Sequence, residues 1–385
     1  MAVIMMDLKK ITALIVAAVL FVSGNAVRAE ALNSADVSAK ACVLIEAATG
    51  DIIFGKNENM KLPMASTTKI MTTLLTLESG DLDEEFAVDS EAIKVEGSSM
   101  GLTEGDIVTK RALCYGMMLP SGNDAANASA VKLGGNFADF AEMMNRRAAD
   151  IGMKNTSFVT PSGLDDKDHY STAYDMSILA AEAMKNPEFR EICGSKNAQL
   201  CFGNPPYTRW LRNTNKLLGF YDHCIGIKTG FTDEAGRCLV SAAEKDGVML
   251  ICVTLNAPND WNDHIKMYDY GFSAVTKYPL SVDIGKNEMD VVGGTADKCG
   301  ISLRDVPSCG FVSDKRSEVT MTVYLPEFVY APVTAGDVVG KAVYCYNGRE
   351  IASADIYAES DVSAVVTERK KGLFESVMDF VKNII

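Results

Sequence analysis

The sequence predicts an α+β protein in which helices pack on one antiparallel sheet and a small all-β domain follows. Two observations lead to this fold class. Strand patterns lie near the start of the chain and again at residues 225–255, with a long helical stretch between them. Beyond residue 278, short apolar alternations are separated by Gly, Pro and Asp, which is typical of a small β domain.

The predicted elements follow the hydrophobic spacing. A hairpin covers residues 42–47 and 52–54 around the turn at 48–51. Helical spacing covers 64–78, 108–133, 137–151 and 173–184, with breaks at 120–123, 134–135 and 186–187. Strands at 225–230, 238–243 and 248–255 complete the sheet, and a helix over 260–275 closes the unit. In the β domain, alternation marks 319–325, 341–346 and 351–357.

Composition excludes several classes of protein. The 385 residues are 48% hydrophobic and 23% charged, which is ordinary globular composition and rules out collagenous, disordered and polytopic membrane chains. The 37 Lys and Arg against 51 Asp and Glu give a net charge of −14. An acidic chain without a basic stripe argues against a nucleic-acid partner.

Cysteine and histidine give no metal or redox motif. The ten cysteines are scattered without a C-x-x-C pair, so we predict no metal centre and no cofactor, and the cysteine pattern leaves the disulfide state open. Cys42, Cys238 and Cys252 sit inside apolar runs and are expected to be small buried hydrophobic residues. The three histidines fit no nucleophile or metal pattern and are expected at the surface: His169, His223 and His264.

The two ends of the chain predict export and membrane attachment. In residues 1–31, Lys9 and Lys10 precede an apolar run at 11–23 and small residues, which is the order of a secretory signal cleaved after Ala29 or Ala31. A retained anchor is the alternative, but a span needs about 20 apolar residues. In residues 361–385, three basic residues at 369–371 come first. On a helical wheel at 100° per residue, the apolar residues that follow them occupy one arc of about 160°.

Such a tail suits an amphipathic helix that lies in the membrane interface. The alternative is docking on the protein's own domain or on a partner. We therefore expect an exported protein, peripheral on the outer face of the cytoplasmic membrane. The expected domains are residues 35–278 and 279–360, between the signal and the tail.

Three short motifs carry the candidate chemistry: Ser66-Thr67-Thr68-Lys69, Ser121-Gly122-Asn123 and Lys228-Thr229-Gly230. Each motif alone is weak evidence for a catalytic site. A helix cap explains the first motif, a turn explains the second, and an exposed charge at a strand end explains the third. Together, on a helix start, an interhelical turn and a strand, they favour a catalytic site.

The first motif supplies a nucleophile and its base. Residues three apart on a helix share a face, so the Lys69 amine can reach the Ser66 hydroxyl. A serine alcohol needs a base, and lysine serves only when neutral, which burial and a nearby cation such as Lys228 promote. Ser121 is then expected to pass the proton to the leaving amine.

The remaining residues are expected to hold a peptide. Asn123 would bind a substrate amide, and Lys228 and Thr229 would bind a terminal carboxylate beside the strand edge. Gly230 would leave room for the ligand. The backbone N–H groups of Ser66 and Phe231 are expected to form the oxyanion hole.

These motifs closely resemble the penicillin-binding protein and serine β-lactamase superfamily, and more narrowly the low-molecular-mass D-alanyl-D-alanine carboxypeptidases. Supporting stretches lie at residues 63–69, 119–126, 161–164, 171–173, 228–232, 235–236 and 331–336, and the resemblance covers about residues 35–360. It implies acylation of Ser66 by the penultimate D-alanine of a peptidoglycan stem peptide, release of the terminal D-alanine, and inhibition by β-lactams.

One departure and several alternatives stand beside this hypothesis. Thr214 occupies a position where some members carry an arginine that helps to bind the substrate carboxylate. A β-lactamase would share the motifs but needs a deacylating base, and Glu182 to Asn186 has the spacing only inside a predicted helix. A transpeptidase differs in its acceptor alone. A non-catalytic peptidoglycan or β-lactam sensor would not need a serine and a lysine one turn apart.

Overall fold

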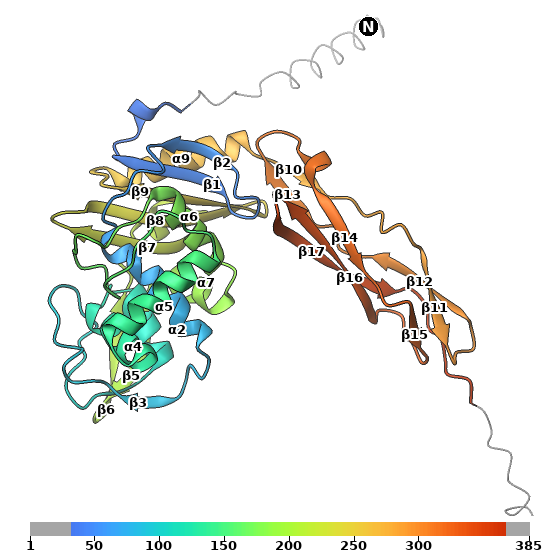
Figure 1. The fold of residues 1–385 in the computed structure, drawn as a ribbon, viewed down its shortest axis with the longest axis horizontal. Helices are drawn as coiled ribbons and strands as arrows, with labels where there is room; N and C mark the ends of the chain where they lie inside the picture. Colours follow the sequence, from blue (N-terminus) through green and yellow to red (C-terminus); the bar gives the residue numbers. More distant parts are fainter. Residues whose placement is uncertain (1–31, 367–385) are drawn as a thin grey trace, which may run out of the picture. The chain divides into compact units, whose positions relative to one another are not determined.

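The computed structural model describes residues 32–366, which divide into two compact units between Thr276 and Lys277 (Figure 1). The predicted signal at 1–31 and nearly all of the predicted tail lie outside the described residues. No helix in the described part is long and apolar enough to cross a membrane.

One antiparallel sheet organises the N-terminal unit, as the sequence predicts. Its strands run in the order β2-β1-β9-β8-β7, so the first and last segments of the unit pair in the middle of the sheet. The strands are β1 (Ala41–Glu46), β2 (Ile52–Lys56), β7 (Cys224–Thr232), β8 (Gly236–Lys245) and β9 (Val248–Leu255). This order leaves β7 as one edge strand.

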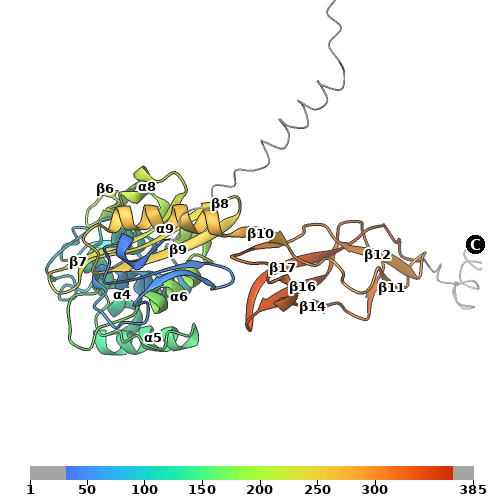
Figure 2. The same ribbon diagram turned by 90° about the horizontal axis from the view of Figure 1, so that it is seen from above.

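Both faces of the sheet are covered, which explains the continuous apolar runs of its strands. On β1, Val43 and Ile45 pack into the helical core, whereas Cys42 and Leu44 pack on the opposite face with Met267 of α9 (Asp260–Ala274). Figure 2 shows α9 and α6 on opposite sides of the sheet. Cys42, Cys238 and Cys252 are fully buried, which confirms their predicted packing role, and all ten thiols are free.

The helical middle forms the rest of this unit. Its helices are α2 (Lys69–Glu78), α3 (Lys110–Met118), α4 (Asn123–Gly134), α5 (Phe137–Asp150), α6 (Ala173–Ala183), α7 (Pro187–Gly194) and α8 (Leu217–Phe220). A short 3-10 helix, η1 (Ser34–Asp36), precedes β1. Thr109, Asn136, Thr172 and Asn186 accept a hydrogen bond from the backbone N–H three residues ahead, which fixes four of the helix starts.

Three local elements differ from the sequence prediction. Val108 belongs to a short strand rather than to the helix, in the pair β3 (Glu85–Ala87) and β4 (Ile107–Thr109). Pro187 begins α7 instead of only ending α6, because Asn186 caps the new helix and proline fits its first position. The hairpin β5 (Asn197–Gly203) and β6 (Pro206–Arg212) was not expected.

The C-terminal unit is all-β, as predicted. A six-stranded sheet has the order β14-β16-β17-β12-β11-β15, in which only β11 and β15 pair in parallel, and β10 pairs with β13. The strands are β10 (Thr276–Pro279), β11 (Glu288–Val292), β12 (Lys298–Leu303), β13 (Ser308–Phe311), β14 (Thr320–Tyr324), β15 (Phe328–Tyr330), β16 (Val338–Tyr346) and β17 (Arg349–Ala358), with a 3-10 helix η3 (Arg316–Glu318).

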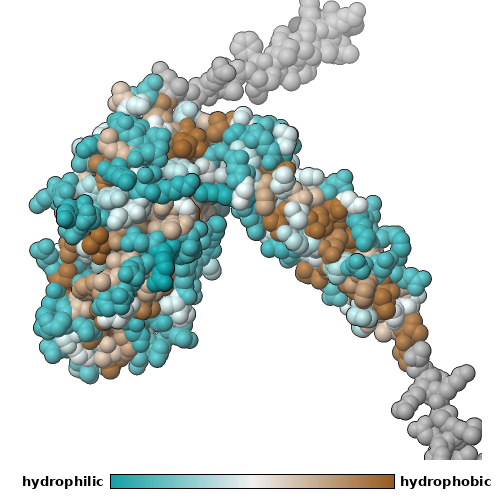
Figure 3. Space-filling model, in the orientation of Figure 1, coloured by the Kyte–Doolittle hydropathy of each residue, from teal (hydrophilic) through white to brown (hydrophobic). Residues whose placement is uncertain are grey.

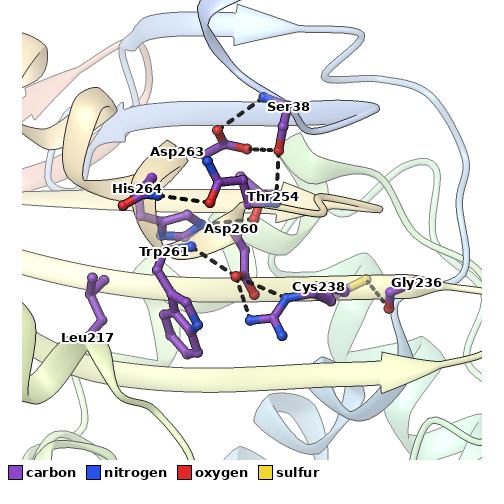
Figure 4. A network of polar contacts seen from close by, with 12 residues as sticks. Ser38, Leu217, Gly236, Cys238, Thr254, Asp260, Trp261, Asp263 and His264 are labelled. Carbon is purple, nitrogen blue, oxygen red and sulfur yellow. Dashed lines mark hydrogen bonds and ion pairs between the residues drawn. The ribbon is translucent and has the colours of Figure 1, made fainter.

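The expectation that the histidines lie at the surface is wrong for two of them. His264 is fully buried, and its two ring nitrogens contact the hydroxyls of Ser241 at 2.6 Å and Thr254 at 3.0 Å. Figure 4 shows His264 and Thr254 in this network between α9 and the sheet. His169 is 3% exposed, while His223 is half-buried. Hydrogen bonds to groups distant in sequence satisfy the buried rings, which a local motif search cannot see.

Lowering the pH should destabilise the N-terminal unit through His264. Burial lowers its pKa from the ordinary 6.5 to about 3, so the unfolded chain takes up a proton first and stability falls as the pH drops from 6.5 toward 3. We expect this group alone to remove about 2 kcal/mol of unfolding free energy between about pH 7.5 and pH 5.

Urea denaturation of the wild type and of His264→Gln at both pH values measures this effect. The variant keeps every other titrating group, including the buried His169, so the difference between the two losses isolates His264. Equal losses in both proteins would contradict the assignment.

Candidate active site

Ser66 lies in a strained turn at the start of the first long helix. The turn is a 3-10 helix, η2 (Ala65–Thr68), that leads directly into α2. Ala65 has a φ of 49°, a left-handed conformation that costs a non-glycine residue about 1 kcal/mol. The two threonine hydroxyls of the turn donate to the carbonyl oxygens of Met64 at 2.7 Å and Ala65 at 2.9 Å, which holds this geometry.

Lys69 follows the turn, and its amine is surrounded by three oxygen atoms. Its Nζ lies 2.9 Å from Ser66 Oγ, 2.7 Å from Asn123 Oδ1 and 2.7 Å from the carbonyl oxygen of Ser162. The amide and carbonyl oxygens only accept hydrogen bonds, so they hold two of the amine hydrogens. In the neutral amine, the lone pair is then left for the hydroxyl hydrogen of Ser66.

Two effects favour that neutral amine. Lys69 is fully buried, and burial lowers its pKa well below the ordinary 10.5; the charge of Lys228 lowers it further, while Asp124 opposes both. Burial also lowers the pKa of Lys228 to about 7. Lys228 Nζ donates to the carbonyl oxygen of Thr229 at 2.9 Å. Lys228 is thus a buried amine near Lys69 rather than an exposed strand-end charge.

The second motif lies between α3 and α4. Ser121 has a φ of 66° and is 7% exposed. Asn123 begins α4, where its Oδ1 accepts from Lys69 and its Nδ2 donates to the carbonyl oxygen of Glu96 at 2.7 Å. Both ends of this amide therefore bond protein groups, and its contact with a substrate stays a prediction.

The next residue, Asp124, shapes the site although sequence reasoning did not select it. Its buried carboxylate accepts hydrogen bonds from the N–H groups of Met100, Gly101 and Leu102, at 2.9 to 3.0 Å, and from the Ser99 hydroxyl at 2.6 Å. These bonds fold the loop over the start of α4. The available signal was the acid at the start of a helix, directly after the Ser121-Gly122-Asn123 motif.

The third motif lies on the edge strand β7. A Cβ on Gly230 would meet the Met64 carbonyl oxygen and the Ser66 nitrogen, each at 3.1 Å, so glycine lets the strand approach the nucleophile's turn. Close packing against this turn is therefore a second reason for glycine at position 230, beside the predicted room for a ligand. Thr229 contacts Thr214 through their hydroxyls at 2.8 Å.

A cavity of about 330 Å³ joins these elements. Five of the predicted site residues line it, while Lys69, Asn123 and Lys228 are not among its lining residues and are buried. The lining residues are Ser66, Ser98, Ser121, Thr214, Lys216, Thr229, Gly230, Phe231, Arg237, Asp260 and Trp261. The hydroxyls of Ser66, Ser121 and Thr229 therefore lie at the cavity wall, and the amines of Lys69 and Lys228 are buried.

His169 is a second residue that sequence reasoning missed, because it supports the site without lining it. Its Nδ1 accepts from the backbone N–H groups of Val159 at 2.9 Å and Thr160 at 3.2 Å, so the neutral ring carries its hydrogen on Nε2. Nε2 contacts the Thr68 hydroxyl at 2.8 Å, which itself donates to Ala65. Burial lowers the pKa of His169 to about 4, which keeps this chain of hydrogen bonds intact at neutral pH.

Comparison with known families identifies the family of this chain. A family model described as D-alanyl-D-alanine carboxypeptidase matches residues 26–259, and one described as penicillin-binding protein 5, C-terminal domain, matches residues 309–364. The chain belongs to the D-alanyl-D-alanine carboxypeptidase family. It is a serine hydrolase of that activity, as the motif resemblance predicts.

Relatives cover between 62% and 86% of this chain. The carboxypeptidase DacF of Bacillus subtilis is 33% identical over 340 residues, 84% of this chain and 86% of that protein. Penicillin-binding protein 5 from Haemophilus influenzae superposes with a TM-score of 0.61 at 29% identity, over 86% of this chain and all of that chain. The Streptomyces K15 DD-transpeptidase superposes with a TM-score of 0.59 at 33% identity, over 62% and 98%.

Gly163→Ala should damage the site by displacing the Ser66 turn. Gly163 has a φ of +86°, and an added Cβ would lie 1.9 Å from the Ala65 carbonyl oxygen, so the turn must move. We expect the rate of acylation by benzylpenicillin to fall at least about tenfold, since small displacements of reacting groups are costly.

Gly152→Ala is the matched control. Gly152 has a φ of +89° and no heavy atom within 4 Å of the added Cβ, so it carries the same backbone penalty without the collision. Intact-mass time courses of both variants, after circular dichroism confirms folding, measure the difference. Equal acylation rates would show that the contact does not position Ser66.

Proposed function

We propose that Ser66, Lys69 and Ser121 carry out the carboxypeptidase reaction in this chain. The observation that carries the proposal is the Lys69 amine, fully buried and 2.9 Å from Ser66 Oγ with its other two contacts made to acceptor oxygens. In this arrangement the neutral amine accepts the hydroxyl proton while Ser66 Oγ attacks the carbonyl carbon of the penultimate D-alanine.

Collapse of the tetrahedral intermediate breaks the peptide bond. Ser121 Oγ passes a proton to the nitrogen of the departing D-alanine and recovers one from the Lys69 side. Water then attacks the acyl-enzyme ester, loses its proton to the same base and releases the shortened stem peptide. The N–H groups of Ser66 and Phe231 stabilise the oxyanion in both steps, a role supported by the presence of both residues at the cavity wall.

Substrate binding is assigned to Asn123 and to the edge strand. An extended peptide ending in D-Ala-D-Ala would lie along β7, with Lys228 and Thr229 near its terminal carboxylate and Gly230 beside the scissile bond. β-Lactams present a strained amide and a carboxylate at a similar spacing, so they would acylate Ser66 and leave it blocked.

Ser66→Ala should abolish both acylation and D-alanine release, because no other group supplies the nucleophile. An intact-mass time course with excess benzylpenicillin, followed by peptide mapping, detects the adduct in the wild type and its loss in the variant. Ser79→Ala, on the turn after α2, removes a hydroxyl outside the cavity and serves as the control. D-Alanine release at the wild-type rate from Ser66→Ala would refute the mechanism.

The place of action follows from the substrate, which is cell-wall peptidoglycan. We propose that residues 1–31 direct export and that residues 361–385 hold the enzyme peripherally on the outer face of the cytoplasmic membrane. Exposed apolar side chains on the C-terminal unit support a membrane-facing role: Phe328, Tyr330, Val365 and Val366 are 41%, 71%, 52% and 86% exposed. Figure 3 shows apolar patches on this unit. Aromatic residues favour the membrane interface.

A chain ending at Thr367 should lose vesicle binding but keep carboxypeptidase activity. Sedimentation with vesicles containing anionic lipid measures the first property, and D-alanine release measures the second. Phe380→Glu, on the predicted apolar face, should also lose binding, whereas Asn383→Glu, on the polar face, should keep most of it. Unchanged sedimentation of the shortened chain would refute anchoring by the tail.

A further inference from the structure

A second cavity in the N-terminal unit is lined by three basic residues and by no acidic one. It has a volume of about 420 Å³ and lies between the base of the β5–β6 hairpin and α8. Lys196 and Arg212 come from the two ends of the hairpin, and Lys216 directly precedes α8. Figure 2 shows β6 and α8 close together, as the shared cavity requires. We call this space the basic cavity.

Backbone hydrogen bonds bring the two cations of the hairpin to the same place. Asn197 pairs with Arg212 in the β5–β6 register, and the N–H of Asn213 donates to the carbonyl oxygen of Lys196 at 2.9 Å. Asn213 Nδ2 also donates to the carbonyl oxygen of Ser195 at 2.9 Å. These bonds fix the base of the hairpin, so the positions of the two basic residues follow from the fold.

The charges of this cavity are not neutralised by the protein. Within residues 32–366, no ion pair or side-chain hydrogen bond involves Lys196, Arg212 or Lys216, and all three residues are exposed. The whole chain carries a net charge of −14, so a group of cations without an acidic neighbour is not a result of composition. Because like charges repel, an anion bound among them would lower the free energy of this region.

Asn215 adds a hydrogen-bond donor to the same wall. It lines the basic cavity and is 3% exposed. Its Oδ1 accepts from the N–H of Leu217 at 3.1 Å, whereas its Nδ2 is buried and has no hydrogen-bond partner among the described residues. Burying an unpaired donor is costly, and native structures normally provide an acceptor. An acceptor oxygen in the cavity that Asn215 lines would satisfy this group.

We propose that the basic cavity binds a phosphate group. Three separate cations and an amide donor suit an anion with more than two acceptor oxygens, whereas the fork of Arg212 alone can pair both oxygens of a carboxylate. Arg212 would hold two phosphate oxygens, and Lys196 and Lys216 would contact the others as point charges. The cavity is larger than one phosphate, so it has room for the group to which the phosphate is esterified, beside the exposed ring of Phe220.

The basic cavity shares a wall with the cavity that Ser66 lines. Thr214 lines the Ser66 cavity, whereas its neighbours Asn213 and Asn215 line the basic cavity, and Lys216 lines both. A bound phosphate therefore places negative charge beside the wall of the Ser66 cavity. The inference does not rest on the proposed acylation of Ser66, because phosphate binding is measured without any reaction.

Isothermal titration calorimetry of the full chain with sodium phosphate tests the proposal, at neutral pH and at an ionic strength held constant with NaCl. We expect saturable binding to the wild type. Arg212→Gln should raise the Kd roughly tenfold, the effect of losing one charge-assisted hydrogen bond. Lys196→Gln should raise it less, because lysine contributes a point charge rather than a fork. Arg146→Gln, an exposed arginine on α5 outside both cavities, is the matched control and should bind as the wild type does.

Two further titrants identify the source and the chemistry of the anion. A glycerol phosphate oligomer presents phosphate esters, and tighter binding of the oligomer than of inorganic phosphate would assign the cavity to esterified phosphate. Tighter binding of inorganic phosphate would assign it to free phosphate, and both results support the site. Tricarballylate carries three carboxylates and no phosphorus, and it should bind at least about tenfold more weakly than phosphate.

Three results would overturn the proposal. The first is the absence of saturable phosphate binding to the wild type. The second is loss of binding in Arg237→Gln but not in Arg212→Gln, which would place the anion in the Ser66 cavity, because Arg237 lines only that cavity. The third is tricarballylate binding as tight as phosphate binding, which would make the cavity a carboxylate site.

Discussion

The site depends on one electrostatic constraint: an amine is kept in the protein interior beside a serine hydroxyl. Burying a lone ammonium group is costly, and the chain reduces that cost by letting Lys69 lose its proton more easily rather than by pairing it with a carboxylate. The nearest partners, Asn123 Oδ1 and the Ser162 carbonyl oxygen, are neutral acceptors. A carboxylate in either place would have held the proton on the amine and removed the base.

The surrounding structure keeps that arrangement rigid. Ala65 and Ser121 both adopt left-handed backbone conformations next to the reacting groups. Such strain persists only where neighbouring contacts over-determine it, and here the contacts come from distant segments. His169 acts on Ala65 through Thr68, and Gly163 allows the close approach of its own loop to the same carbonyl. The antiparallel sheet supplies the last contact, because Gly230 lets β7 lie against the turn.

The sequence predicts the parts of the site that are local and misses those that depend on distant partners. Ser66 and Lys69 are three residues apart, so helical geometry alone brings them together. The sheet is predictable because the hydrophobic pattern of each of its strands is visible in the sequence. His169 and Asp124 were missed since their partners lie on other segments, and a buried histidine has the same local sequence as an exposed one. Pro187 was read only as an end, although Asn186 before it signals a new helix.

The alternation of strand β7 gives its two faces different surroundings. Lys228 and Gly230 face the Ser66 turn, whereas Thr229 and Phe231 face the side on which α9 and Arg237 lie. A substitution on the second face can change the open side of the cavity without altering the surroundings of Lys69. Burial constrains the proposed base, whereas a few polar side chains define the open side of the cavity.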